Sequence, residues 1–285
     1  MPVRKKKGVK RASLKTDQDF PRFLKRVRKE EKVRLLQLSE GIMTASQLAR
    51  IEKGERSVCK NVRDRLLGRL GISSDLYENL LDIEDHAEWE QQRDILCAVE
   101  QKAFQKAQEL IAAYGAQGSR SDKIKQQFCL VMQAEIMRQQ GADQSEIGAC
   151  YERAVRLTVP DVENLFVTHK LLAIQEINMV LEYAFYHKSA DFAQKCRDLM
   201  DYVEHSAYDE LSKVKIYPKI VYYYLQEMTS DSDIQIPEKL DRCLEICNRA
   251  IEMLRDTGRA YFLLELLEMK IQILENIEKV PEKCG

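Results

Sequence analysis

The sequence has little glycine and little proline, 11 and 6 residues among 285. Because both residues interrupt regular structure, their scarcity favours long helices over a turn-rich β architecture. No apolar run approaches the ~20 residues that a membrane-spanning helix needs, and the basic N-terminus lacks the apolar stretch of a secretory signal. We therefore expect an all-α protein of the cytoplasm, without a membrane partner.

Signatures of catalysis and of metal binding are missing as well. There is no glycine-rich phosphate loop, no Gly-x-Ser-x-Gly motif and no His or Cys set at metal-ligand spacing. The 8 cysteines stand singly in apolar helical patterns, as core residues of a reducing compartment do. Cys243 and Cys247, one helical turn apart, could support a metal, but we predict no metal, no cofactor and no enzymatic activity.

The charge is divided unevenly along the chain. Residues 1–75 hold 21 basic and 9 acidic side chains, a balance of +12, whereas residues 76–285 hold 24 basic and 37 acidic ones, a balance of −13. The first part attracts a polyanion and the second repels it. Residues 1–18 are basic without apolar periodicity, so we expect a flexible arm that is either simply solvated or adds nonspecific phosphate contacts.

Residues 19–75 show the three- and four-residue apolar spacing of short packed helices. The second helix, from about residue 35 to 40, ends at Gly41, which can take the left-handed conformation. Thr44 offers an N-cap hydroxyl to a third helix that buries Leu48 and Ile51. A fourth helix closes at Gly71, and a fifth short helix follows at residues 76–81. Two short helices joined by a tight turn, inside a basic region, are typical of a helix-turn-helix.

The block FLKRVRKEEKV…LSEGI…SQLARIEKGERS…LLGRLGI, residues 23–72, resembles the helix-turn-helix of the Cro/CI (XRE-type) regulators, most specifically in ARIEKGER, residues 49–56. In that family a long helical-repeat domain often follows, as in the Rgg, PlcR and PrgX group of Gram-positive regulators that bind short signalling peptides. The helix pairs from residue 84 onward are similar to that arrangement. The resemblance implies a domain of five helices that binds double-stranded DNA.

The resemblance also implies which side chains contact DNA. Thr44, Ala45, Ser46 and Gln47 open the recognition helix and would face the major groove, and Arg50 would reach a base or a phosphate. The remaining candidates for phosphate contacts are Lys53, Arg56, Arg26, Arg28 and Arg34. Glu52 is better explained by an ion pair with a core-adjacent arginine such as Arg28.

Two departures weaken the expected sequence readout. Most relatives begin the second helix with a polar cap and a glutamine, where this chain has Arg34-Leu35-Leu36. Ala45 replaces a frequent glutamine that can read adenine, a contact worth about 1–3 kcal/mol of discrimination. The leucine pair could instead pack on the linker helix or on another subunit. A degenerate motif that serves protein contacts is therefore the alternative.

Beyond residue 76 the sequence predicts a helical repeat domain. Amphipathic segments come in pairs, at 86–101 with 103–114, 121–139 with 144–157, 162–186 with 190–205 and 209–228 with 238–256, before a last segment at 259–279. Pairs of this length stack into an α-solenoid of tetratricopeptide-like hairpins. An irregular helical bundle is the alternative.

A solenoid has a concave surface that suits an extended peptide. Polar and aromatic residues that interrupt the apolar first helices are the candidates for lining it: Gln133, Arg138, Lys170, Gln175, Asn178, Tyr222, Tyr223 and Gln226. Each could instead belong to the core or to a solvated face. We expect a regulator that binds DNA as a homodimer and senses a short peptide, with a protein-interaction scaffold as the alternative.

Overall fold

The computed structural model describes residues 19–72, 83–117, 122–164, 170–187, 191–230 and 237–279. Within these ranges all regular structure is helical, which confirms the all-α prediction. None of the helices in these ranges is long and apolar enough to cross a membrane. The predicted arm at residues 1–18 and the predicted fifth helix at 76–81 lie outside the described residues.

The described part of the N-terminal domain, residues 19–72, contains the helices α1 (Asp19–Glu30), α2 (Leu35–Ser39), α3 (Ala45–Glu52) and α4 (Lys60–Arg69). Leu24, Leu38, Leu48 and Leu66 are fully buried where these helices meet. Gly41, Gly54 and Gly71 follow the second, third and fourth helices with φ of +73°, +74° and +76°. The left-handed ending predicted at Gly41 and the helix end predicted at Gly71 are therefore confirmed, and Gly54 ends the third helix in the same conformation.

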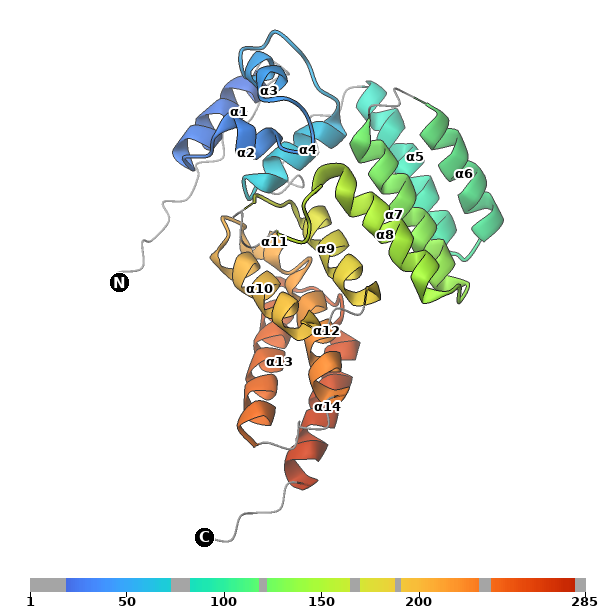
Figure 1. Ribbon diagram of the computed structural model, residues 1–285, viewed down its shortest axis with the longest axis vertical. Helices are drawn as coiled ribbons and strands as arrows, with labels where there is room; N and C mark the ends of the chain where they lie inside the picture. The colour runs from blue at the N-terminus through green and yellow to red at the C-terminus, as the bar shows by residue number, and fades with distance from the viewer. Residues whose placement is uncertain are drawn as a thin grey trace.

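The remaining helices are α5 (Ile83–Glu100), α6 (Phe104–Ala116), α7 (Lys123–Gln139), α8 (Gln144–Thr158), α9 (Ile174–Tyr186), α10 (Phe192–His205), α11 (Glu210–Lys213), α12 (Tyr217–Ser230), α13 (Pro237–Thr257) and α14 (Leu263–Lys279). They stack as hairpins, α5 with α6, α7 with α8, α9 with α10 and α12 with α13, and α14 closes on α12 and α13. Figure 1 shows α1–α4 at one end of the molecule and α13 and α14 at the other. The predicted solenoid is confirmed.

Two predicted helical segments differ in the structure from what the sequence indicated. Of the segment 162–186, the described residues 162–164 and 170–173 are not helical, and α9 begins at Ile174. Side chains satisfy the backbone just before it: the Leu172 N–H donates to the Tyr202 hydroxyl at 2.8 Å and the Ala173 N–H to Glu176 at 2.8 Å. The segment 209–228 breaks into α11 and α12. Pro218 lacks the N–H that a continuous helix would bond to the carbonyl of residue 214.

The N-terminal domain packs closely on the repeat domain. A Cβ on Gly41 would lie 2.0 Å from the carbonyl oxygen of Thr158 in α8, and a Cβ on Gly71 would lie 2.6 Å from the backbone of Ala207. Both contacts are too short for any side chain. These two glycines therefore serve twice, since the turn geometry and the domain contact each require them.

A buried ion cluster crosses the same interface. Arg69 of α4 bonds both oxygens of Glu176 in α9, at 2.7 and 3.0 Å, and Arg65 lies 3.2 Å from the same carboxylate. Burial alone would raise the pKa of Glu176, but the two arginines outweigh it and hold that pKa at about 2. Arg69 also donates to the carbonyls of Leu38 and Glu40, which ties the end of α2 to α9.

Candidate functional site

The start of α3 is held by a reciprocal capping pair. The Thr44 hydroxyl accepts from the Gln47 N–H at 3.2 Å, and the Gln47 side-chain carbonyl accepts from the Thr44 N–H at 2.9 Å. The predicted N-cap is confirmed. Because the carbonyl of Gln47 accepts a bond in the cap, the amide NH₂ is the group of this side chain that the cap leaves unused.

One face of α3 carries polar side chains into solvent. Ser46, Arg50 and Lys53 are exposed and stand at positions i, i+4 and i+7, one above the other along the helix. Leu48 and Ile51 are buried on the opposite side. Thr44 and Arg56 are also exposed at the two ends of this face, and Ala45 is half-buried. The face therefore has the shape and polarity that reading a major groove requires.

Glu55, in the turn after α3, competes for the cations of this face. Its carboxylate lies 3.5 Å from Nε of Arg50 and 3.9 Å from Nζ of Lys53. The side chains of Arg50 and Lys53 remain 61% and 64% exposed, so water screens both pairs. A phosphate can displace such a weak partner, at the cost of bringing an anion close to Glu55.

Arg28 lies in a different place from the one expected for a phosphate contact. Its guanidinium bonds Glu52 in two places, at 2.5 and 2.8 Å, and donates to the Val33 carbonyl at 2.9 Å. The ion pair predicted for Glu52 is confirmed. The phosphate contact predicted for Arg28 is corrected, because its donors are engaged inside the domain. Arg26 and Arg34 are exposed, and Arg26 lies 4.0 Å from Glu30.

The start of α2 lacks a side-chain cap, as the sequence indicated. The Arg34 side chain makes no cap hydrogen bond, and the Arg34 N–H instead donates to the Gln37 side chain at 3.0 Å. Leu35 packs against the core of the domain, whereas Leu36 is 69% exposed. The altered stretch therefore places one leucine in solvent beside the candidate DNA-contacting helix.

A groove of about 1120 Å³ runs along the repeat domain. Its walls come from α5, α7, α9 and α12, which are the first helices of successive hairpins, and from the last helix α14, with Tyr151 added by α8. The helix α4 of the N-terminal domain also contributes lining residues. First helices of stacked hairpins line the concave side of a solenoid, as expected from the sequence.

Six of the eight residues predicted to bind a peptide line this groove: Arg138, Gln175, Asn178, Tyr222, Tyr223 and Gln226. The other two predictions are corrected. Gln133 lies outside the groove on an exposed part of α7. Lys170 precedes α9 and points to the N-terminal domain, where its Nζ lies 3.3 Å from Glu40.

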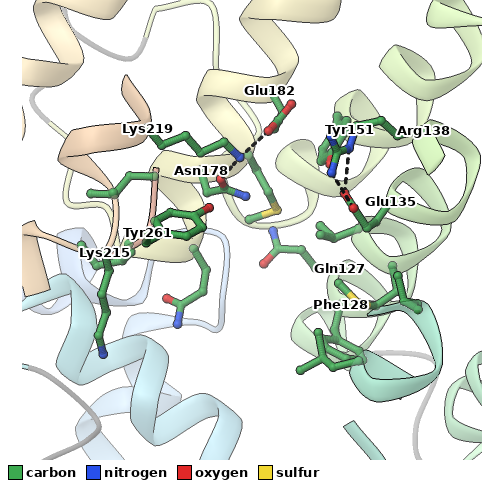
Figure 2. Close-up of a pocket in the computed structure, with 18 of the residues that line it drawn as sticks. Gln127, Phe128, Glu135, Arg138, Tyr151, Asn178, Glu182, Lys215, Lys219 and Tyr261 are labelled. Atoms are coloured by element: carbon green, nitrogen blue, oxygen red, sulfur yellow. Dashed lines mark hydrogen bonds and ion pairs between the residues drawn. The ribbon is translucent and has the colours of Figure 1, made fainter. Parts of the chain in front are cut away.

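The groove has a polar network on one side. Nζ of Lys219 donates to Asn178 at 2.7 Å and contacts the carboxylate of Glu182, which also accepts from the Tyr223 hydroxyl at 3.1 Å. Figure 2 shows Lys219 and Asn178 facing Arg138 and Glu135 across the groove. Burial raises the pKa of Tyr223, and the Glu182 carboxylate raises it further, so this hydroxyl stays a proton donor.

Gln127 is a lining residue that the sequence did not single out. Its amide NH₂ donates to the Ala154 carbonyl at 2.8 Å and to the Thr158 hydroxyl at 2.9 Å. Its side-chain oxygen is buried and has no hydrogen-bond partner among the described residues. Figure 2 shows this side chain between Asn178 and Phe128. A ligand with an N–H group can satisfy the oxygen.

Comparison with known proteins gives one structural likeness. No family profile and no curated protein matches the sequence. Among solved structures, the chain is similar to PlcR of Bacillus thuringiensis in the crystal structure with the peptide PapR7 and DNA, with a TM-score of 0.47 and 16% identity over 91% of this chain and 88% of that chain. This is the group that the sequence resembled. At this identity and TM-score the likeness assigns no function.

Proposed function

We propose that this protein is a DNA-binding transcriptional regulator that acts as a homodimer and binds a short peptide in its groove. The observation that carries the DNA-binding part is the exposed face of α3, with Ser46, Arg50 and Lys53 aligned along it. A helix presented in this way, backed by a packed domain, fits the B-DNA major groove. One such unit covers a half-site, which is why two copies are needed.

The charge around α3 supports the same assignment. Residues 19–72 hold 14 basic and 7 acidic side chains. Three of the basic ones, Arg28, Arg65 and Arg69, are engaged in buried ion pairs and do not face DNA. An excess of exposed cations remains, which is sufficient for salt-dependent phosphate contacts. The acidic repeat domain adds no such contacts, so DNA is directed to the α3 side.

The groove suits a peptide better than a compact metabolite. At about 1120 Å³ it exceeds the usual range of about 300–1,000 Å³ for small-molecule pockets. Side-chain amides on its walls, from Gln175, Asn178 and Gln226, can bond a peptide backbone, and tyrosines supply rigid contact area. The unpartnered oxygen of Gln127 accepts an N–H, which every peptide unit except proline offers.

A second function, a scaffold that uses the helix-turn-helix for protein contacts, is favoured by one observation. Leu36 is 69% exposed next to α3, where a polar cap would otherwise stand. A leucine in the place of a polar cap suits a contact with a protein surface better than a contact with a phosphate. The scaffold and the regulator differ in one property: only the regulator selects a DNA sequence.

Selection from random duplexes tests the DNA-binding part. The full-length protein is incubated with a pool of random-sequence DNA at low salt, and bound duplexes are amplified over several rounds. We expect enrichment of a common half-site, lost when Arg50→Ala protein is used. A pool that stays random after selection with the wild-type protein favours the scaffold.

A thermal-shift screen tests the groove. The full-length protein is heated with a random-sequence library of short peptides, and peptides that raise Tm are identified. A peptide that binds only the folded state at 100 times its Kd stabilises by about 2.7 kcal/mol. If no peptide raises Tm, the peptide-binding part of the proposal is wrong.

A further inference from the structure

The last helix described, α14, is apolar on two sides. Leu266, Met269 and Ile273 are buried where α14 meets α12 and α13. The other side bears a row of exposed apolar residues that we call the α14 stripe: Leu264, Leu267, Ile271 and Leu274, which are 73%, 40%, 57% and 39% exposed. At about 100° per residue, the stripe lies nearly opposite the buried side.

The spacing of the stripe is that of a helix-pairing seam. Its members follow one another at three, four and three residues, as positions a and d of a heptad do. Single exposed leucines are ordinary on a protein surface, but four in one line are not. Helices with this seam bury it against a second helix. In the described part of the chain, no helix covers it.

The charges beside the stripe indicate the orientation of that second helix. Lys270 occupies the flanking position g, and Glu268 and Glu275 occupy position e on the other flank. In a parallel pair of identical helices, Lys270 of one copy faces Glu275 of the other, twice by symmetry. In an antiparallel pair Glu268 faces Glu275, and the two lysines face each other. Charge complementarity therefore favours a parallel pair of identical helices.

We propose that the α14 stripe is the homodimer interface and that two copies of this chain pair their α14 helices in parallel. The two-fold axis then runs along α14, which lies along the long axis of the molecule at the end away from α1–α4 (Figure 1). Both N-terminal domains consequently lie at the same end of the dimer. That placement is useful only if the DNA-binding proposal holds, but the pairing itself does not depend on it.

Sedimentation of the full-length protein, without DNA, tests the interface. Wild type sediments as a dimer at micromolar concentration. In the dimer, Ile271→Glu places one unpaired charge from each copy in the seam. We expect the dimer to dissociate at a concentration on the order of 100-fold or more higher than that of wild type. The matched control is Leu211→Glu on α11, another exposed leucine, 48% exposed, which stays dimeric. A monomeric wild type, or an Ile271→Glu protein that remains as dimeric as wild type, overturns the proposal.

A charge exchange tests the parallel orientation. Lys270→Glu opposes two like charges in a parallel pair and weakens the dimer about fivefold, since exposed ion pairs contribute under about 1 kcal/mol each. Adding Glu275→Lys to the same chain restores the pairs and the affinity. If the double exchange fails to restore the dimer, the parallel pairing is wrong. Because no DNA is present, a failure here is distinct from a failure to select a DNA sequence.

Discussion

The two candidate sites of this protein differ in how they are built. The α3 face is made by one short stretch of the chain, from Thr44 to Lys53, and its cap, exposed face and buried face all follow from local rules. The groove takes its walls from helices between residue 60 and residue 279, so no local rule specifies it. The N-terminal domain and the repeat domain meet at Arg65, Arg69 and Glu176. Substitutions at this contact are expected to lower the stability of the protein most.

The largest effect is expected where the two regions meet. Glu176→Ala leaves Arg65 and Arg69 buried without their counter-ion, which costs about 3–5 kcal/mol of unfolding free energy. Urea unfolding followed by circular dichroism measures it. The control is Glu163→Gln, which removes a 49% exposed partner of Arg156 and costs less than about 1 kcal/mol. Equal losses in the two variants would mean that the buried cluster does not join the domains.

The same cluster gives a pH dependence. The pKa of Glu176 is about 2 in the folded protein against an ordinary 4.5, so its stabilisation is complete above pH 4.5 and is lost as the pH falls toward 2. The difference corresponds to about 3 kcal/mol. Unfolding free energies between pH 6 and pH 2 measure it, and Glu176→Gln removes this part of the acid sensitivity. An identical pH profile in the two proteins contradicts the assignment.

A smaller effect is expected in the groove. Gln175→Ala removes one amide from the wall and weakens a peptide found by the thermal-shift screen by about 1 kcal/mol, or about fivefold. Gln133→Ala is the matched control, since this glutamine lies on α7 outside the groove. Isothermal titration of the full-length protein measures both. If Gln133→Ala weakens the peptide as much as Gln175→Ala does, the peptide does not lie in the groove.

The smallest effect is expected beside α3. Glu55→Gln removes the carboxylate shared by Arg50 and Lys53, and DNA affinity rises by up to about 1 kcal/mol, an amount that shrinks as salt is added. Fluorescence anisotropy with a selected duplex at two salt concentrations measures it. The comparison variant is Glu30→Gln. It removes a carboxylate that lies about as far from Arg26 on α1 as Glu55 lies from Arg50 and Lys53, but away from α3. A rise independent of salt would argue against an electrostatic cause.

The sequence predicted the α3 side well, since helix caps and apolar periodicity are local. Thr44, Gly41 and the Arg28–Glu52 pair are all found as expected. The charge balance of +12 for residues 1–75 included Arg65 and Arg69, although both are buried. Nothing in their own helix reveals this, because their counter-ion lies in α9, more than 100 residues away.

The sequence predicted that the repeat domain has a concave surface lined by first helices, but it did not identify all of the residues that line the groove. Polar interruptions of the first helices identified six lining residues, but Gln127 looked like an ordinary helical polar residue, and the inward side of each helix depends on how the hairpins stack. The start of α9 was wrong for a related reason. The hydroxyls of Tyr202 and Tyr208, which replace helical hydrogen bonds at Leu172, come from α10 and the segment after it, about 30 residues further along the chain.

The most direct test of the central claim, that α3 reads DNA, is the affinity of the full-length protein for its selected duplex and for a scrambled one. We predict that wild type prefers the selected duplex, that both affinities fall as salt rises, and that Arg50→Ala lowers the preference by about 1–3 kcal/mol while leaving nonspecific binding largely intact. Equal affinity of the wild-type protein for the two duplexes, or an unchanged preference in Arg50→Ala, would contradict the claim.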